Sequence, residues 1–165
     1  MADSKSIEFI EKLISFDTTS RESNLELIAF IQDYLIDLGI DSQLIHNEEG
    51  TKANLYATVG DTNTSGVMLS GHTDVVPIDG QDWDTNPFKV TQKGSRLYGR
   101  GTSDMKSFIA ITLAQLPKFQ ARSLKTPIHL AFSYDEEVGC IGVRRLIEAL
   151  NGMPVKPAMC IIGEP

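Results

Sequence analysis

Apolar residues recur at helical spacing along the opening part of the chain, and this pattern predicts two amphipathic helices. The first helix would present one apolar face, formed by Ile7, Ile10, Leu13 and Ile14. The second is predicted to begin at a capping box, in which Ser23 caps the helix and Glu26 reaches back, and to end at Gly39. We expect both helices to serve packing alone.

Shorter runs rich in apolar and β-branched residues follow, and they predict strands. The expected strands span residues 41–46, 54–59, 67–70, 128–133 and 159–162, with a hairpin at 88–90 and 96–98. Two further helices are expected near 108–116 and 141–150. Strands that alternate with helices predict an α/β fold, arranged as three α/β/α layers around a central, largely parallel mixed sheet.

Composition limits the classes of partner. The chain has 165 residues, of which 41% are hydrophobic, so it can form one ordinary domain with an apolar core. Its formal net charge of −7 argues against a nucleic-acid partner, because phosphate binding needs a basic face. No apolar run approaches membrane-spanning length, and the N-terminus has no apolar signal core. We therefore expect a cytoplasmic protein without a membrane partner.

Both cysteines and two of the histidines are expected to have no catalytic role. Cys140 and Cys160 form neither a CxxC pair nor a disulfide framework, so we expect free, buried thiols in a reducing compartment. His46 is expected in a loop, and His129 is expected to pack within its strand. A nucleophilic Cys–His pair is an alternative, but no activating motif surrounds either thiol.

The candidate chemical groups share one placement in the predicted fold. Each stands directly after an apolar strand or where a glycine-flanked loop enters a helix. In open α/β sheets, ligands bind beyond the carboxyl ends of the strands, so separate segments can deliver these groups to one crevice. The candidates are His72, Asp74, Asp104, Glu136, Glu137 and Glu164.

Imidazole and carboxylate groups of this kind suit a pair of divalent metal ions such as zinc, cobalt or manganese. A carboxylate can bridge two ions, and Asp74 is close enough in sequence to orient His72. Adjacent Glu136 and Glu137 could divide metal binding and proton transfer. Taken singly, the His-x-Asp segment would be a surface loop, the Glu pair a solvated turn and Asp104 a helix cap.

Three long motifs and the closing segment together resemble the metallopeptidase family M20. They read Ser-Gly-His-Thr-Asp-Val-Val-Pro at 70–77, Gly-Arg-Gly-Thr-Ser-Asp-Met-Lys at 99–106, Ser-Tyr-Asp-Glu-Glu-Val-Gly-Cys at 133–140 and Gly-Glu-Pro at 163–165. Within the family the sequence is most similar to the acetylornithine deacetylases, through residues 16–20, 79–83, 133–140 and 160–165. The resemblance implies a zinc-peptidase-like catalytic domain.

The same resemblance implies a role for each candidate ligand. His72 and Glu164 would bind the first of two Zn²⁺ or Co²⁺ ions, Asp104 would bridge both ions, and Glu137 would bind the second. The family pattern also implies a cis peptide bond between Asp104 and Met105. These expectations come from the resemblance and not from the spacing of the residues.

The reaction implied by the resemblance is hydrolysis of N2-acetyl-L-ornithine to L-ornithine and acetate, a step of arginine biosynthesis. Glu136 would be the general base that deprotonates water and returns the proton to the leaving amine, and Asp74 would orient His72. The partner would be a small N-acylated amino acid. The alternatives are another M20 hydrolase, such as a succinyl-diaminopimelate desuccinylase or an aminoacylase, and a non-catalytic metal-binding or interaction module.

By this resemblance, residues 1–165 are the N-terminal part of the metal-binding catalytic domain. The lid and dimerisation domain and the C-terminal part of the catalytic domain would be absent, so the fold is expected to be truncated. The second metal would then lack its closing histidine, and the chain alone is expected to have little or no deacetylase activity. We expect it to retain one metal ion weakly, and a full-length form to be a homodimer.

Overall fold

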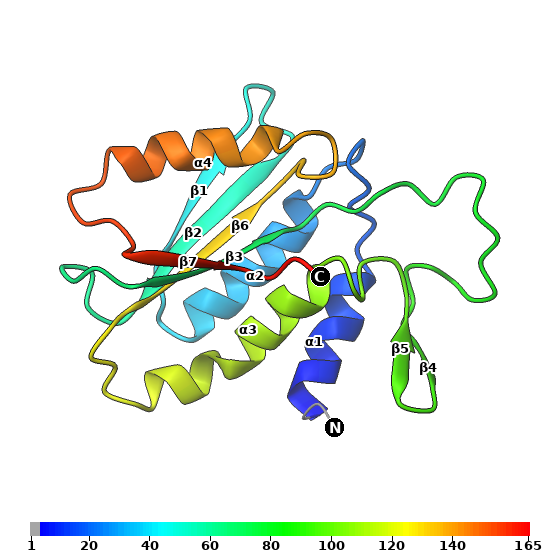
Figure 1. Cartoon of the computed structure of the whole chain (residues 1–165), viewed down its shortest axis with the longest axis horizontal. Coiled ribbons are helices and arrows are strands. Elements are labelled where there is room, and N and C mark those ends of the chain that lie inside the picture. Colours follow the sequence, from blue (N-terminus) through cyan, green and yellow to red (C-terminus); the bar gives the residue numbers. More distant parts are fainter. Residues whose placement is uncertain (1–3) are drawn as a thin grey trace.

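A five-stranded mixed sheet divides the protein into layers, as seen in a computed structural model that describes residues 4–165 (Figure 1). The helices are α1 (Ser4–Ile14), α2 (Leu25–Asp37), α3 (Lys106–Gln120) and α4 (Ile141–Asn151). The sheet contains β1 (Ser42–His46), β2 (Ala53–Val59), β3 (Val67–His72), β6 (Ile128–Ser133) and β7 (Met159–Ile162). A separate hairpin consists of β4 (Thr91–Lys93) and β5 (Arg96–Tyr98).

The strand order in the sheet is β1-β2-β6-β3-β7, and the prediction of a largely parallel mixed sheet is confirmed. β3 pairs in parallel with both β6 and β7, whereas β2 is antiparallel to both of its neighbours. Only β2 therefore runs against the other four strands. The register pairs His72 with Ser133, so β3 and β6 end at the same level and deliver the residues that follow them to one edge.

Alternate residues of the central strands contact the two helical layers. Leu55 and Phe132 belong to the main core with α1, α2 and α3, whereas Tyr56 and Ala131 pack with Leu146 of α4. Figure 1 shows α4 covering one face of the sheet and α2 and α3 covering the other, with α1 beside α3. The period-two alternation of a strand thus accounts for the predicted three layers.

The predicted capping box at the start of α2 is wrong. The N-cap residue is Asn24, and its side chain makes no capping hydrogen bond. Its amide instead bonds the backbone of Ala53 in the neighbouring strand, while the Ser23 hydroxyl donates to the Thr51 carbonyl at 2.6 Å. Ser23 Oγ accepts the Leu25 N–H at 3.2 Å, but Asn24, the N-cap residue, uses its side chain for tertiary contacts. The predicted stop is confirmed, because Gly39 adopts φ 69 immediately after Leu38, the C-cap residue of the helix.

The first strand of the hairpin lies three residues later than predicted, at Thr91–Lys93 instead of 88–90. A turn occupies the predicted position, since Asn86 Oδ1 accepts the Phe88 N–H at 2.9 Å and the Asn86 carbonyl accepts the Lys89 N–H at 3.2 Å. The bond from the Phe88 N–H to the Asn86 side chain stabilises a turn at this position in place of strand pairing. The second strand is confirmed at Arg96–Tyr98.

The expectations about the cysteines and His46 need correction, and those about membrane segments and the N-terminus are tested only within the described residues. Cys140 and Cys160 are free, but both are exposed, because Cys140 lies in the turn before α4 and Cys160 in the edge strand β7. His46 is the exposed last residue of β1 and does not lie in a loop. None of the helices within residues 4–165 has the length and apolar character needed to cross a membrane. The expectation about the N-terminal segment falls partly on residues 1–3, outside the described residues.

Candidate metal and catalytic site

The candidate groups converge at the edge of the sheet where β3, β6 and β7 end. β3 ends at His72, the turn after β6 carries Glu136 and Glu137, and Glu164 follows β7. Asp104 reaches the same place from the loop that enters α3. The strand-end rule that predicted this convergence is therefore confirmed for the positions of these residues.

His72 is the centre of the cluster, with only 2% of its surface exposed. Its Nε2 lies 2.9 Å from Asp104 Oδ1, 3.3 Å from Glu164 Oε1 and 3.8 Å from Glu136 Oε2. Its Nδ1 faces the other way, 2.9 Å from the Asp74 carbonyl oxygen and 3.4 Å from Asp74 Oδ1. One ring nitrogen thus faces carboxylates from three separate segments, while the other is held by Asp74.

The backbone at the end of β3 is fixed by close packing against α3. A Cβ atom at Gly71 would lie 2.9 Å from Met105 Cε, so only glycine lets this side chain approach so closely. The His72 N–H donates to Met105 Sδ at 3.3 Å. The Asp104–Met105 peptide bond is cis, which confirms the expectation from the family resemblance. These contacts bring Asp104 and His72 together.

Asp74 is held by several donors, and sequence reasoning found only one of its partners. Its carboxylate accepts the Ser20 hydroxyl at 2.7 Å and the backbone N–H groups of Glu136 and Glu137 at 3.0 and 3.2 Å. Burial raises the pKa of Asp74, but the bonds from His72, Ser20 and Glu136 outweigh burial and lower it. Asp74 is therefore ionised, and it couples His72 to the turn that carries both glutamates.

The loop after α1 adds a short parallel bridge beside β3, which the sequence did not reveal. Thr19 pairs with Val75, the Val75 N–H donates to the Thr18 carbonyl, and the Ser20 N–H donates to the Val75 carbonyl, both at 3.1 Å. The Thr18 hydroxyl also donates to the Thr73 carbonyl. Thr18, Thr19 and Ser20 are all buried, although they are polar. Three polar residues in a row between two amphipathic helices were the available cue.

The charges of the cluster shift the pKa values of its members. Burial lowers the pKa of His72, but the carboxylates of Asp74, Asp104 and Glu164 outweigh it and raise the pKa to about 9. Burial and then the negative charge of Asp104 raise the pKa of Glu137. Burial and neighbouring carboxylates also raise the pKa of Glu164, although His72 opposes them. The cluster thus carries excess negative charge that a bound cation would offset.

The donor set fits a divalent metal ion. The described residues contain two sets of possible ligands, and within each set the ligand atoms all lie within 4.8 Å of one another. One set is His72, Glu136 and Glu164, and the other is His72, Asp104 and Glu137. Imidazole nitrogen with carboxylate oxygen is the chemistry of zinc, cobalt and manganese sites. Together these groups contain all four predicted ligands and the predicted base. Which residue serves which ion, and in what role, stays a prediction.

The remaining candidate nucleophile and histidines lie apart from this arrangement or have other contacts. Cys140 Sγ donates to Glu136 Oε1 at 3.3 Å, so the thiol contacts the proposed base and not a histidine. His129 is 2% exposed and stacks on Tyr56, whose hydroxyl lies 2.8 Å from His129 Nδ1. The prediction that His129 packs within its strand is confirmed.

Comparison with known proteins gives a consistent family assignment. The sequence profile described as "Peptidase family M20/M25/M40" matches residues 68–165. An acetylornithine deacetylase from Buchnera aphidicola is 36% identical over 165 residues, covering 96% of this chain and 42% of that protein. One from Shigella sonnei is 37% identical over 146 residues, covering 87% of this chain and 37% of that protein. The chain thus spans about two fifths of the length of these relatives.

Solved structures share the fold at lower sequence identity. Human carnosine dipeptidase 1 matches with a TM-score of 0.82 and 22% identity, covering 95% of this chain and 38% of that one. An M20 family metallo-carboxypeptidase from Sulfolobus solfataricus matches with a TM-score of 0.81 and 23% identity, covering 98% of this chain and 37% of that one. These likenesses confirm the zinc-peptidase-like α/β/α architecture.

Proposed function

This chain belongs to the peptidase family M20/M25/M40, and we propose that it forms the metal-binding part of a hydrolase that deacetylates N2-acetyl-L-ornithine. The products would be L-ornithine and acetate, in arginine biosynthesis. Family membership supports hydrolysis of an amide bond with the help of divalent metal ions. The choice of substrate rests on the relatives named acetylornithine deacetylase, which match almost the whole chain.

The observation that carries the proposal is the set of carboxylates that surround His72 Nε2. Carboxylate oxygens of Asp104, Glu164 and Glu136 lie 2.9, 3.3 and 3.8 Å from this single nitrogen, and each comes from a different segment. A packing histidine does not need several carboxylates on one nitrogen. A ligand of a catalytic metal does, because the other ligands must converge on the same ion.

We assign the ligands by combining this geometry with the family resemblance. His72 and Glu164 would hold one ion, Asp104 would bridge, and Glu137 would hold a second ion whose coordination needs a further histidine. The ions would be Zn²⁺ or Co²⁺. When bound, they would supply Lewis-acid chemistry that polarises the amide carbonyl and lowers the pKa of water.

Glu136 is the group best placed to move the proton. Its backbone is fixed by Asp74, whereas its carboxylate projects toward His72 Nε2 and is about one-third exposed. It would accept a proton from the attacking water and return it to the leaving amine. Asp74 would hold His72 Nδ1, so that Nε2 keeps facing the reacting groups.

We further propose that residues 1–165 are the N-terminal part of a larger catalytic domain, in line with the 42% of the relative's length that they span. A lid and dimerisation domain and the remaining ligand histidine would come from the rest of the protein. The partner would be a small N-acylated amino acid, and the longer form a homodimer. The absence of nucleic-acid and membrane partners and the cytoplasmic location stay predictions.

The experiment that tests the function assays the product of the complete reading frame with N-acetylornithine and with N-succinyl-diaminopimelate. Acetate release from the first substrate, at least about tenfold faster than succinate release from the second, is expected. Glu136→Gln should lower kcat about 10²–10⁴-fold, whereas Glu148→Gln on the exposed side of α4 should not. Preference for the succinylated substrate would contradict the proposed substrate, and full activity of Glu136→Gln would contradict the proposed base.

A further inference from the structure

Lys52 joins two loops that lie far apart in the sequence. Its Nζ donates to Asp135 Oδ1 at 2.6 Å and also to the Ser20 carbonyl oxygen. The side chains of Lys52 and Asp135 are only 13% and 16% exposed. Exposed ion pairs contribute little, but a pair so shielded from water is screened weakly and costs more to break.

The position of Lys52 is fixed from its own side as well. It stands immediately before β2, and Asn47 Oδ1 accepts the N–H groups of Thr51 and Lys52, both at 2.9 Å. The next residue, Ala53, donates its N–H to Asn24 Oδ1 at 3.0 Å. The ammonium group is therefore carried by a turn whose backbone is held by Asn47 and Asn24, and the Lys52 side chain is largely buried.

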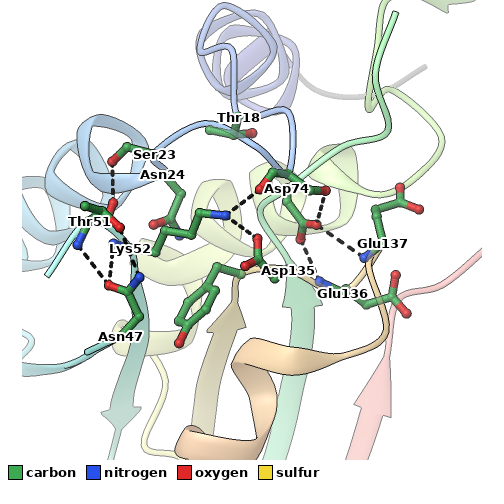
Figure 2. A network of polar contacts seen from close by, with 12 residues as sticks. Thr18, Ser23, Asn24, Asn47, Thr51, Lys52, Asp74, Asp135, Glu136 and Glu137 are labelled. Atoms are coloured by element: carbon green, nitrogen blue, oxygen red, sulfur yellow. Dashed lines mark hydrogen bonds and ion pairs between the residues drawn. The ribbon is translucent and has the colours of Figure 1, made fainter. Parts of the chain in front are cut away.

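The two segments that Lys52 joins are the same two that meet at Asp74. Ser20 donates its hydroxyl to Asp74 Oδ2, and the residues after Asp135 donate their backbone N–H groups to the two Asp74 oxygens. Figure 2 shows Lys52 reaching Asp135 from one side, while the carboxylates of Glu136 and Glu137 point away from Asp74 on the other. Lys52 and Asp74 thus hold one turn from two sides.

We propose that Lys52, acting through Asp135, is a positioning residue that holds the Glu136–Glu137 turn in register for catalysis. This rests on the proposed function, in which Glu136 transfers the proton and Glu137 binds metal. The positive charge of Lys52 also compensates Asp135, which would otherwise add a sixth carboxylate beside Asp74, Asp104, Glu136, Glu137 and Glu164. Lys52 does not touch the reacting groups, so its effect is entirely on their placement.

The backbone of Asp135 offers a variant that removes the ion pair while keeping the turn. Asp135 adopts φ 53, a left-handed conformation that asparagine also tolerates well. Asp135→Asn therefore removes the charge without changing the backbone preference. Lys52→Met removes the ammonium group and keeps most of the side-chain length, and Lys52→Arg keeps the charge and its donors.

The first measurement is amide hydrogen exchange by NMR on the metal-free 165-residue chain. In Lys52→Met and Asp135→Asn, the N–H groups of Glu136 and Glu137 should exchange at least about tenfold faster, while the amides of β6 stay protected. Lys52→Arg should retain most of the protection of the Glu136 and Glu137 amides. This readout does not depend on any enzymatic activity.

The second measurement uses the product of the complete reading frame. Lys52→Met and Asp135→Asn should each lower kcat by about 10–100-fold with KM changed less than about threefold, because the placement of the base is impaired and not the binding of substrate. The double variant should lose no more than the worse single variant, because both break the same ion pair. Arg145→Met is the matched control, since Arg145 forms an equally short 2.6 Å pair with Glu48 that is exposed.

The two measurements separate the positioning role from the proposed function. Unchanged exchange at Glu136 and Glu137 in Asp135→Asn and in Lys52→Met would overturn the positioning role, whatever the activity. If Lys52→Met does not fold, Asp135→Asn and Lys52→Arg still decide the question. Faster exchange in a protein that hydrolyses no N-acylated amino acid would support the positioning role and overturn the proposed function alone.

Discussion

The backbone N–H of Glu136 donates to Asp74 Oδ1 at 3.0 Å, across 62 positions of sequence. The same Asp74 lies 3.4 Å from His72 Nδ1 through the same oxygen. One buried carboxylate therefore fixes both the imidazole at the centre of the cluster and the backbone of the proposed base. A change at Asp74 should affect metal affinity and proton transfer together.

Asp74→Asn should weaken Zn²⁺ binding by about 10–100-fold, the usual effect of losing the partner that orients a ligand histidine. The amide keeps one oxygen acceptor but places an NH₂ group against the N–H donors or the Ser20 hydroxyl. Calorimetry with Zn²⁺ on the 165-residue chain checks this prediction. Asp61→Asn is the control, because Asp61 bonds only its own exposed turn among the contacts described. Equal affinities of the two variants would contradict the role of Asp74.

Zinc binding should become stronger as the pH rises. The pKa of His72 is raised to about 9 in the metal-free protein, above its ordinary value of 6.5, so the imidazole is protonated at neutral pH. Protonated His72 stabilises the metal-free fold fully below pH 6.5, and this contribution is lost as the pH rises through about 9. Metal binding needs the neutral imidazole, so the affinity should rise about tenfold per pH unit from about pH 7 to pH 8.

The proton count gives a direct check on this pH dependence. Calorimetry near pH 7 in buffers of different ionisation enthalpy should show about one proton released from His72 per Zn²⁺ bound. The expected number falls toward zero in His72→Ala, which should also lose most of the affinity. An affinity that stays flat across this range, with no proton released, would show that His72 is not the group displaced by the metal.

The packing of α4 should be sensitive to a single added methyl group at Gly142. A Cβ atom at Gly142 would lie 2.1 Å from the Tyr134 carbonyl oxygen, whereas one at Gly152 would meet the Ala149 oxygen at an ordinary 3.5 Å. Gly142→Ala should therefore lower the free energy of unfolding by about 1–3 kcal/mol, and Gly152→Ala should leave it within about 0.5 kcal/mol. Urea titration followed by circular dichroism measures both, and equal midpoints would contradict the close contact.

Much of the fold was predictable from the sequence because apolar periodicity reports burial directly. The bounds of α4 and β6 follow the prediction closely, since each has an apolar face toward the core. The start of α2 was predicted to within a residue or two, but its cap was not, because Asn24 bonds Ala53 and Thr73 in preference to its own helix. Local rules cannot anticipate a side chain that satisfies a distant backbone.

In the candidate site, too, positions that follow from local patterns were predictable and contacts with distant residues were not. The residues around His72 could be found because the glutamates follow strands and Asp104 lies where a glycine-flanked loop enters a helix, and strand ends meet at one edge of a sheet. The contact of Ser20 with Asp74 and that of Lys52 with Asp135 could not be found in this way, since these partners lie 54 and 83 positions away in sequence. Their roles depend on which loops the topology brings together, and only the structure shows that.

The most direct test of the metal site is anomalous diffraction at the zinc edge from crystals of this chain grown with Zn²⁺. We predict a peak about 2.0–2.1 Å from His72 Nε2, with carboxylate oxygens of Asp104 and Glu164 at about 2.0–2.2 Å. The same crystals of His72→Ala should lose that peak. Zinc bound only elsewhere, for instance at the exposed His46, or a peak that persists in His72→Ala, would contradict the account.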